Sequence, residues 1–240
     1  ESTVTHGNRF VNSNTEKSWV AHLSPGATDR NMYITLGYAA MELAKFNEAQ
    51  AYFSKARFNA DTADTVFIAG TILREADAVF MQKDYTKAIA LYNKVIAANT
   101  SDADYARYQK SIILGLSGNN KEKAEILTGL INTTPPSRYA NEARYELGLT
   151  YIEDDKYSAA INILKPLTEA YEMRNMAPKA WMKIGFAHQQ AGDAAKAIDC
   201  YKTIVLEYPS SEERPAALDA LKSLYIQTGQ PEGYAKLLKE

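Results

Sequence analysis

The residues with the strongest potential for chemistry are few, and their spacing does not assemble a reactive centre. Cys200 is the only cysteine, so a disulfide within the chain is impossible, and its place in a helical pattern favours a packed side chain over a reactive thiol. The histidines have no second metal-type ligand at helical spacing: His6, His22 and His188. The tight acidic cluster 153–155 falls in a predicted turn, which is typical of a solvated helix end. We predict no catalytic residues and no metal ligands.

The sequence lacks the motifs that bind phosphates or activate a serine nucleophile. It has no Gly-x-Gly-x-x-Gly, no Gly-Lys-Ser/Thr and no Gly-x-Ser-x-Gly. Lys and Arg number 27 against 29 Asp and Glu, so no basic surface for nucleic acid is expected. No apolar run is long enough to cross a bilayer. These observations predict a protein that is not an enzyme, uses no cofactor, binds no nucleic acid and has no transmembrane segment.

Small residues recur in pairs along the chain, and their spacing predicts repeated helical hairpins. Each pair joins a small residue to an alanine twelve or thirteen positions later: Gly37 and Ala49, Ala76 and Ala88, Ser111 and Ala124, Gly148 and Ala160, Gly185 and Ala197. Turn-forming Asp, Asn and Gly residues lie between the two members, where they cap helix ends. One hairpin cannot bury its apolar face alone, so an array is expected. We expect Gly37, Gly148 and Gly185 to contact the alanine of their own hairpin.

The residues around these pairs resemble the tetratricopeptide repeat. In the clearest copy, Trp181 and Gly185 are followed by Ala197, Tyr201 and a closing Pro209. The resemblance covers about residues 30–238 and implies an all-α, right-handed α-solenoid of about five to six tetratricopeptide-type helix hairpins. The expected array spans 29–240, with repeats at about 30–63, 69–100, 104–136, 141–172 and 178–209 and a partial copy at 215–240. Glu75 departs from the pattern, because leucine is expected there.

The first part of the chain differs from the array in composition. Residues 1–28 are polar and lack a clear helical period, apart from a short apolar patch around Trp19. We predict a weakly ordered N-terminal arm that contacts the first hairpin mainly through Trp19.

The linkers between repeats resemble those of bacterial cell-envelope tetratricopeptide proteins. A Tyr-Pro-x-Ser pattern begins at Tyr208, and a related Pro-rich segment begins at Pro135. They are similar to the BamD-like outer-membrane assembly lipoproteins and the Tol-associated periplasmic coordinators. Other segments, such as 105–111 and 217–225, are still more similar to a large tetratricopeptide family of the Bacteroidetes. The resemblance implies a periplasmic or outer-membrane-associated location, although a cytoplasmic location is also compatible with the sequence.

The resemblance also implies which residues line the concave side of the superhelix, namely those on the first helix of each hairpin. The candidate partner-binding residues are Tyr38, Arg74, Phe80, Tyr108, Gln109, Tyr145, Glu146, Leu149, Met182, Lys183 and Phe186. Two interpretations stay open: the apolar members pack neighbouring first helices together, or they form a groove for a partner segment. Tyr108 and Tyr145 hold equivalent positions in adjacent repeats, so their rings are expected to lie near each other.

These patterns predict a non-catalytic scaffold that binds a protein or peptide partner through the superhelix, in the bacterial cell envelope. The alternative is a structural spacer or dimerisation segment of a longer multidomain protein. Homo-oligomerisation is compatible with either function.

Overall fold

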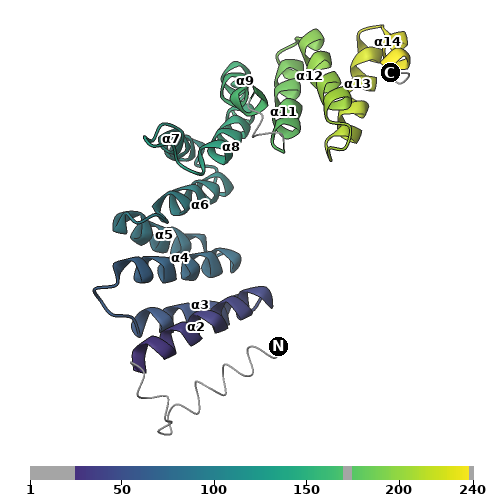
Figure 1. Ribbon diagram of the computed structural model, residues 1–240. Helices are drawn as coiled ribbons and strands as arrows, with labels where there is room; N and C mark the ends of the chain where they lie inside the picture. The colour runs from purple at the N-terminus through teal and green to yellow at the C-terminus, as the bar shows by residue number, and fades with distance from the viewer. Residues whose placement is uncertain (1–24, 170–174, 238–240) are drawn as a thin grey trace. The chain divides into compact units, whose positions relative to one another are not determined.

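The computed structural model describes residues 25–169 and 175–237, and every regular element in these ranges is a helix (Figure 1). The helices are α2 (Pro25–Glu42), α3 (Phe46–Phe58), α4 (Thr65–Met81), α5 (Tyr85–Ala98), α6 (Ala103–Leu116), α7 (Asn120–Ile131), α8 (Ala140–Glu153), α9 (Tyr157–Leu164), α10 (Pro166–Glu169), α11 (Ala177–Gln190), α12 (Ala194–Glu207), α13 (Arg214–Gln227) and α14 (Pro231–Leu237). The predicted all-α class is therefore confirmed. Helix α2 begins at Pro25, inside the stretch predicted as an arm; the predictions for 1–24, including Trp19, lie outside the described residues.

The chain divides into two compact units, one ending at Asn119 and the other beginning at Asn120. In the first unit, α2 to α6 pack in sequence order, each helix against the next. Buried alanines let the backbones approach, while large side chains such as Phe53, Tyr92 and Val95 fill the core. The side chain of Asp64 caps α4 and that of Asp84 caps α5, each by accepting a hydrogen bond from a backbone N–H in the first helical turn.

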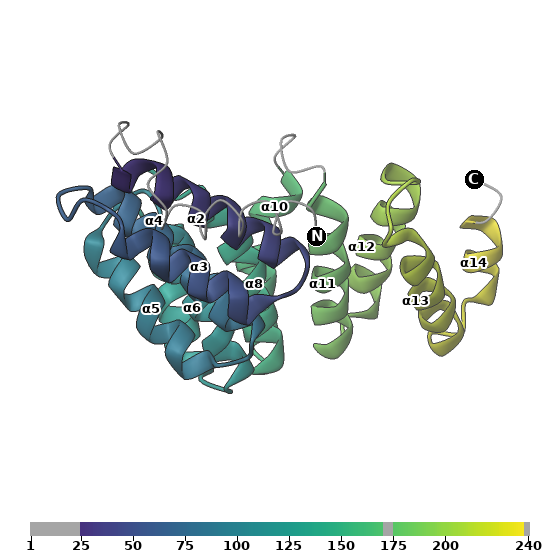
Figure 2. The same ribbon diagram turned by 90° about the horizontal axis from the view of Figure 1, so that it is seen from below.

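The second unit repeats this architecture. Helix α7 packs on α8, and α8 packs on α9 (Figure 1). Helices α11, α12, α13 and α14 follow in order (Figure 2), each packed on the one before. Its cores centre on Leu164, Ile184 and Tyr201. Pro166 separates α9 from α10, since proline has no N–H to continue the helical hydrogen bonds. The side chain of Asp193 caps α12.

The side chains nearest to the helical glycines are larger residues than the expected alanines. A Cβ atom added at Gly37 would lie 2.5 Å from the ring of Phe53, and one at Gly148 would lie 2.5 Å from Leu164. At Gly185 the nearest atom belongs to the ring of Tyr201, at 2.7 Å. The residue that contacts each glycine thus stands one helical turn after the predicted alanine. The reason is that helical side chains lean toward the N-terminus of their own helix and cover the preceding turn.

The register of the third repeat also differs from the prediction. Lys123, and not Ala124, is buried there, and Leu127 and Leu130 continue the same buried face. The other second helices follow the same spacing, as Ala197, Tyr201 and Ile204 show. Lys123 therefore takes the place of the small residue on the second helix. It stands twelve positions after Ser111, which is the spacing that the other four repeats show. A lysine in this position needs a partner for its charge, and Glu146 of α8 supplies it.

Candidate functional site

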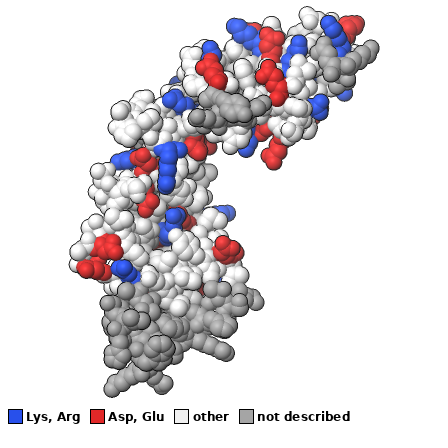
Figure 3. All heavy atoms as spheres, viewed as in Figure 1, with Lys and Arg blue, Asp and Glu red and all other residues white. Residues whose placement is uncertain are grey.

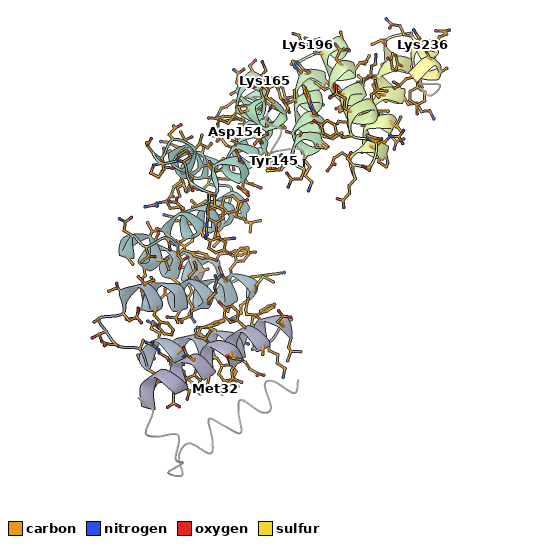
Figure 4. All side chains as sticks on the ribbon, in the orientation of Figure 1. Met32, Tyr145, Asp154, Lys165, Lys196 and Lys236 are labelled. Atoms are coloured by element: carbon orange, nitrogen blue, oxygen red, sulfur yellow. The ribbon has the colours of Figure 1, made fainter. Side chains whose placement is uncertain are left out.

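Several of the predicted groove residues pack inside their own unit. Tyr145, labelled on α8 in Figure 4, packs against the core that contains Leu164 and Ile184. Met182 packs against the core around Tyr201. In the first unit, Phe80 packs on the ring of Tyr85, with 5.9 Å between ring centroids. Burial raises the pKa of Tyr145, and the nearby Glu146 and Glu213 add to this shift. These three side chains are half-buried, so each packs against its own unit and keeps part of its surface exposed.

Two aromatic side chains on first helices stay substantially exposed. Tyr38 of α2 is 47% exposed and Phe186 of α11 is 40% exposed. Tyr38 is nevertheless held in place, because its ring meets that of Phe53 edge-on at 5.5 Å between centroids. A large apolar ring that is fixed at its base and open to solvent is the type of residue that anchors protein interfaces.

Arg74 of α4 joins Tyr38 to a chain of polar side chains in the first unit. Its Nε donates a hydrogen bond to the Tyr38 hydroxyl at 3.1 Å, and its Nη1 donates to Asp77 at 3.0 Å. The other oxygen of Asp77 accepts a hydrogen bond from the hydroxyl of the buried Tyr92 at 2.8 Å. Burial raises the pKa of Asp77, against the opposing effects of Tyr92, Arg74 and Tyr105. Asp77, itself bound by Tyr92, thus holds the guanidinium of Arg74 in place.

Sequence reasoning placed Arg74 in the groove but did not connect it with Tyr92 or Tyr105. Burial and the charge of Asp77 raise the pKa of Tyr92, and the same two causes raise the pKa of Tyr105 to about 12. Both hydroxyls therefore stay protonated at neutral pH. The sequence did contain a signal for these contacts, because Asp77 stands at a position where the other repeats carry aromatic or aliphatic residues. A buried carboxylate there requires hydrogen-bond donors.

A pocket of about 420 Å³ opens between α2 and α4, beside Tyr38 and Arg74. Its lining is formed by Asn31, Ile34, Thr35, Tyr38, Phe67, Gly70, Thr71 and Arg74. The hydroxyls of Thr35 and Thr71 donate to carbonyl groups of their own helices, so the threonines offer mainly methyl groups and acceptor oxygens to the pocket. This is the part of the predicted groove where the structure shows a hollow with both apolar and charged walls.

The remaining candidate residues are distributed over first helices of both units. Tyr108 and Gln109 are half-buried on α6. Leu149 of α8 and Lys183 of α11 are also half-buried. Because Tyr108 belongs to the first unit and Tyr145 to the second, the expected proximity of their rings stays a prediction.

Glu146 is engaged within the protein. Its carboxylate lies 3.2 Å from the ammonium of Lys123, whose side chain is 7% exposed against 21% for Glu146. Removing the carboxylate leaves a buried ammonium without its partner, whereas removing the lysine leaves a more accessible carboxylate. The two single substitutions should therefore differ in cost.

We expect Glu146→Ala to lower the free energy of unfolding by about 2 kcal/mol, and Lys123→Ala to lower it by less than about 1 kcal/mol. Lys123→Ala also restores the small residue that other repeats carry at this position. Urea unfolding followed by far-ultraviolet circular dichroism measures both. Equal losses for the two variants would contradict the assignment of Lys123 to the buried position.

The residues considered for other chemistry have ordinary structural environments. Cys200 is 5% exposed, and burial raises the pKa of its thiol to about 11, so little thiolate forms at neutral pH. Burial lowers the pKa of His188. Within residues 25–169 and 175–237, no three His, Cys, Asp or Glu side chains are grouped so that they could hold a metal ion. In the same part of the chain, no helix is long and apolar enough to span a membrane.

Charges of both signs are mixed on one face of the described part of the chain. Lys and Arg side chains are interspersed with Asp and Glu in each unit on the face that Figure 3 shows. Several of them form ion pairs with close neighbours in sequence, such as Arg107 with Asp104 and Lys196 with Asp193. This face therefore carries no broad patch of a single charge.

Consecutive helices that pack on one another within each unit define the fold as an α-solenoid, with its candidate site on the first helices. Residues 34–103 and residues 179–211 each match a tetratricopeptide repeat family model. These two segments therefore carry tetratricopeptide repeats, which confirms the coarser part of the resemblance. No curated protein is significantly similar to this sequence.

Solved structures show the same fold at low sequence identity. The C-terminal part of a TPR repeat-containing protein from Cytophaga hutchinsonii has a TM-score of 0.74 at 14% identity, covering 98% of this chain and 89% of that one. A tetratricopeptide repeat protein from Parabacteroides merdae has a TM-score of 0.66 at 13% identity, covering 88% and 78%. MamA from Desulfovibrio magneticus RS-1, from residue 41, has a TM-score of 0.61 at 17% identity, covering 77% and 97%.

Proposed function

We propose that this chain is a non-catalytic scaffold that binds a segment of another protein through the first helices of its repeats. The observation that carries the proposal is the pair of exposed aromatic rings, Tyr38 and Phe186, at equivalent positions of two first helices. The α-solenoid fold supports it, because such arrays present long surfaces that suit extended or helical partner segments. Among the predicted site residues, Tyr38 and Phe186 are thus preferred over Tyr145 and Met182.

The test begins with affinity purification and mass spectrometry from the native organism, followed by binding measurements with the purified partner. Tyr38→Ala and Phe186→Ala should each weaken the affinity about thirtyfold, which corresponds to about 2 kcal/mol, because the partner loses an anchoring ring. Phe58→Ala is the matched control: Phe58 is 80% exposed but lies at the end of α3, a second helix. If both first-helix variants fold and bind the partner with unchanged affinity, the first helices are not the binding surface.

The proposed compartment is the bacterial cell envelope, in the periplasm or at the outer membrane. It is supported by the linker patterns at Tyr208 and Pro135, which resemble those of BamD-like and Tol-associated proteins. Fractionation of native cells with an antibody against the chain tests it, and recovery in the cytoplasmic fraction alone would contradict it. The alternative function, a spacer or dimerisation segment, predicts self-association in sedimentation equilibrium that Tyr38→Ala and Phe186→Ala do not affect.

A further inference from the structure

The pocket between α2 and α4 combines features that select one kind of ligand. Arg74 carries the only charge among the described residues that line it, and its side chain is 39% exposed. The compensating carboxylate of Asp77 is 15% exposed and lies behind the guanidinium, where Tyr92 also binds it. A ligand in the pocket therefore contacts the guanidinium of Arg74 directly, whereas the guanidinium separates it from the carboxylate of Asp77.

The guanidinium is also held in one orientation. Tyr38 accepts the hydrogen bond from Nε and Asp77 accepts the one from Nη1, while Nη2 has no acceptor among the described residues. An arginine fixed by two partners loses little further conformational entropy when it binds a third group. Its remaining N–H groups suit a planar carboxylate, which accepts two parallel hydrogen bonds.

The other walls of the pocket are suited to an apolar side chain. Phe67 and Ile34 contribute carbon surface, and Tyr38 contributes the exposed part of its ring. A phosphate would call for a cluster of arginines, whereas this pocket has one.

We propose that this pocket recognises an internal acidic side chain of a partner segment, Glu or Asp, together with a neighbouring apolar side chain. Arg74 binds the carboxylate, Tyr38 and Asp77 position Arg74, and Phe67 and Ile34 receive the apolar group. The inference rests on the proposed scaffold function and specifies the chemistry of the partner at one site.

The probe is a phage library of random 12-residue peptides displayed through their C-termini, selected on the full chain, so that no free terminal carboxylate is available. We expect enrichment of sequences with Glu or Asp beside Leu, Ile, Val or Phe. A selected peptide is then synthesised with an amidated C-terminus, alongside its Glu→Gln (or Asp→Asn) counterpart. On the unaltered chain this change should weaken binding about tenfold in fluorescence anisotropy, as expected for one charged hydrogen-bonded pair.

Variants of the chain test whether Arg74 causes the preference for the acidic peptide over its amide counterpart. In Arg74→Gln the acidic peptide and its amide counterpart should bind within about twofold of each other, and Arg74→Lys should keep part of the preference. Arg107→Gln is the matched control, because Arg107 also pairs with an aspartate three residues away, at 2.8 Å, but does not line the pocket. Circular dichroism of each variant confirms folding, and Arg74→Lys keeps the test valid if Arg74→Gln does not fold.

Three outcomes would overturn the assignment. The first is undiminished discrimination in Arg74→Gln, or in Arg74→Lys if only that variant folds. The second is a library that yields no acidic binders. The third is self-association that Arg74→Gln abolishes, which would give the pocket to a second copy of the chain. The scaffold function survives the first two outcomes if Phe186→Ala still weakens binding of the native partner, so the two failures are distinguishable.

Discussion

Replacing Glu75 with alanine should lower the free energy of unfolding by about 3 kcal/mol, the range expected when one member of a buried ion pair is removed. Glu75 is 5% exposed on α4, and its carboxylate lies 3.1 Å from Nη2 of Arg57 on α3. The pair joins the first hairpin to the second. Without Glu75, the charge of Arg57, whose side chain is 25% exposed, would keep a 3.4 Å hydrogen bond to Ser54 and the ring of Phe58 but no carboxylate partner. Urea unfolding monitored by circular dichroism measures the loss.

Two controls separate the charge from the packing. The double variant Arg57→Met with Glu75→Leu replaces the ion pair by apolar side chains and should recover most of the loss, since leucine is the residue expected at position 75. Asp104→Ala removes the exposed ion pair with Arg107 and should cost less than about 1 kcal/mol. A Glu75→Ala chain that unfolds at the same urea concentration as the parent would show that the pair contributes nothing.

Replacing Gly185 with leucine should also cost about 3 kcal/mol, because the added side chain has no space. A Cβ at this position would lie 2.7, 2.9 and 3.1 Å from three atoms of the Tyr201 ring. Tyr201 is 2% exposed and packs against Leu221 and Tyr225, so its ring cannot move without disturbing the core. The expected result is a lower unfolding midpoint in urea and a lower melting temperature.

Gly129 provides the size-matched control. It lies on the exposed side of α7, and an added Cβ would meet no atom within 4 Å. Gly129→Leu should therefore stabilise the chain by about 0.5–1 kcal/mol, through helix propensity alone. If Gly185→Leu and Gly129→Leu shift the midpoint in the same direction, the close approach of α11 and α12 at Tyr201 is wrong.

Much of the candidate site depends on contacts that repeat spacing does not reveal. The pattern identified first helices, and so it identified Tyr38, Arg74 and Phe186 as candidates. It treated Tyr145 and Met182 as equivalent to them, although both are half-buried against cores of the second unit. Periodicity assigns a residue to a face of its helix, but the neighbouring helix decides whether that face is covered.

The sequence by itself determined the helices, the hairpins and the repeat, because small residues twelve positions apart recur wherever two helices must approach closely. Only the tertiary structure decided which side chains occupy the space that those residues leave. Phe53 and Tyr201 reach back over one turn to cover Gly37 and Gly185, a consequence of side-chain direction rather than of spacing. Lys123 can be buried because Glu146, from the next helix, balances its charge. Arg74 is likewise fixed by Tyr38 and Asp77, which converge on it from two helices, and such pairings depend on three-dimensional neighbours that a single sequence does not specify.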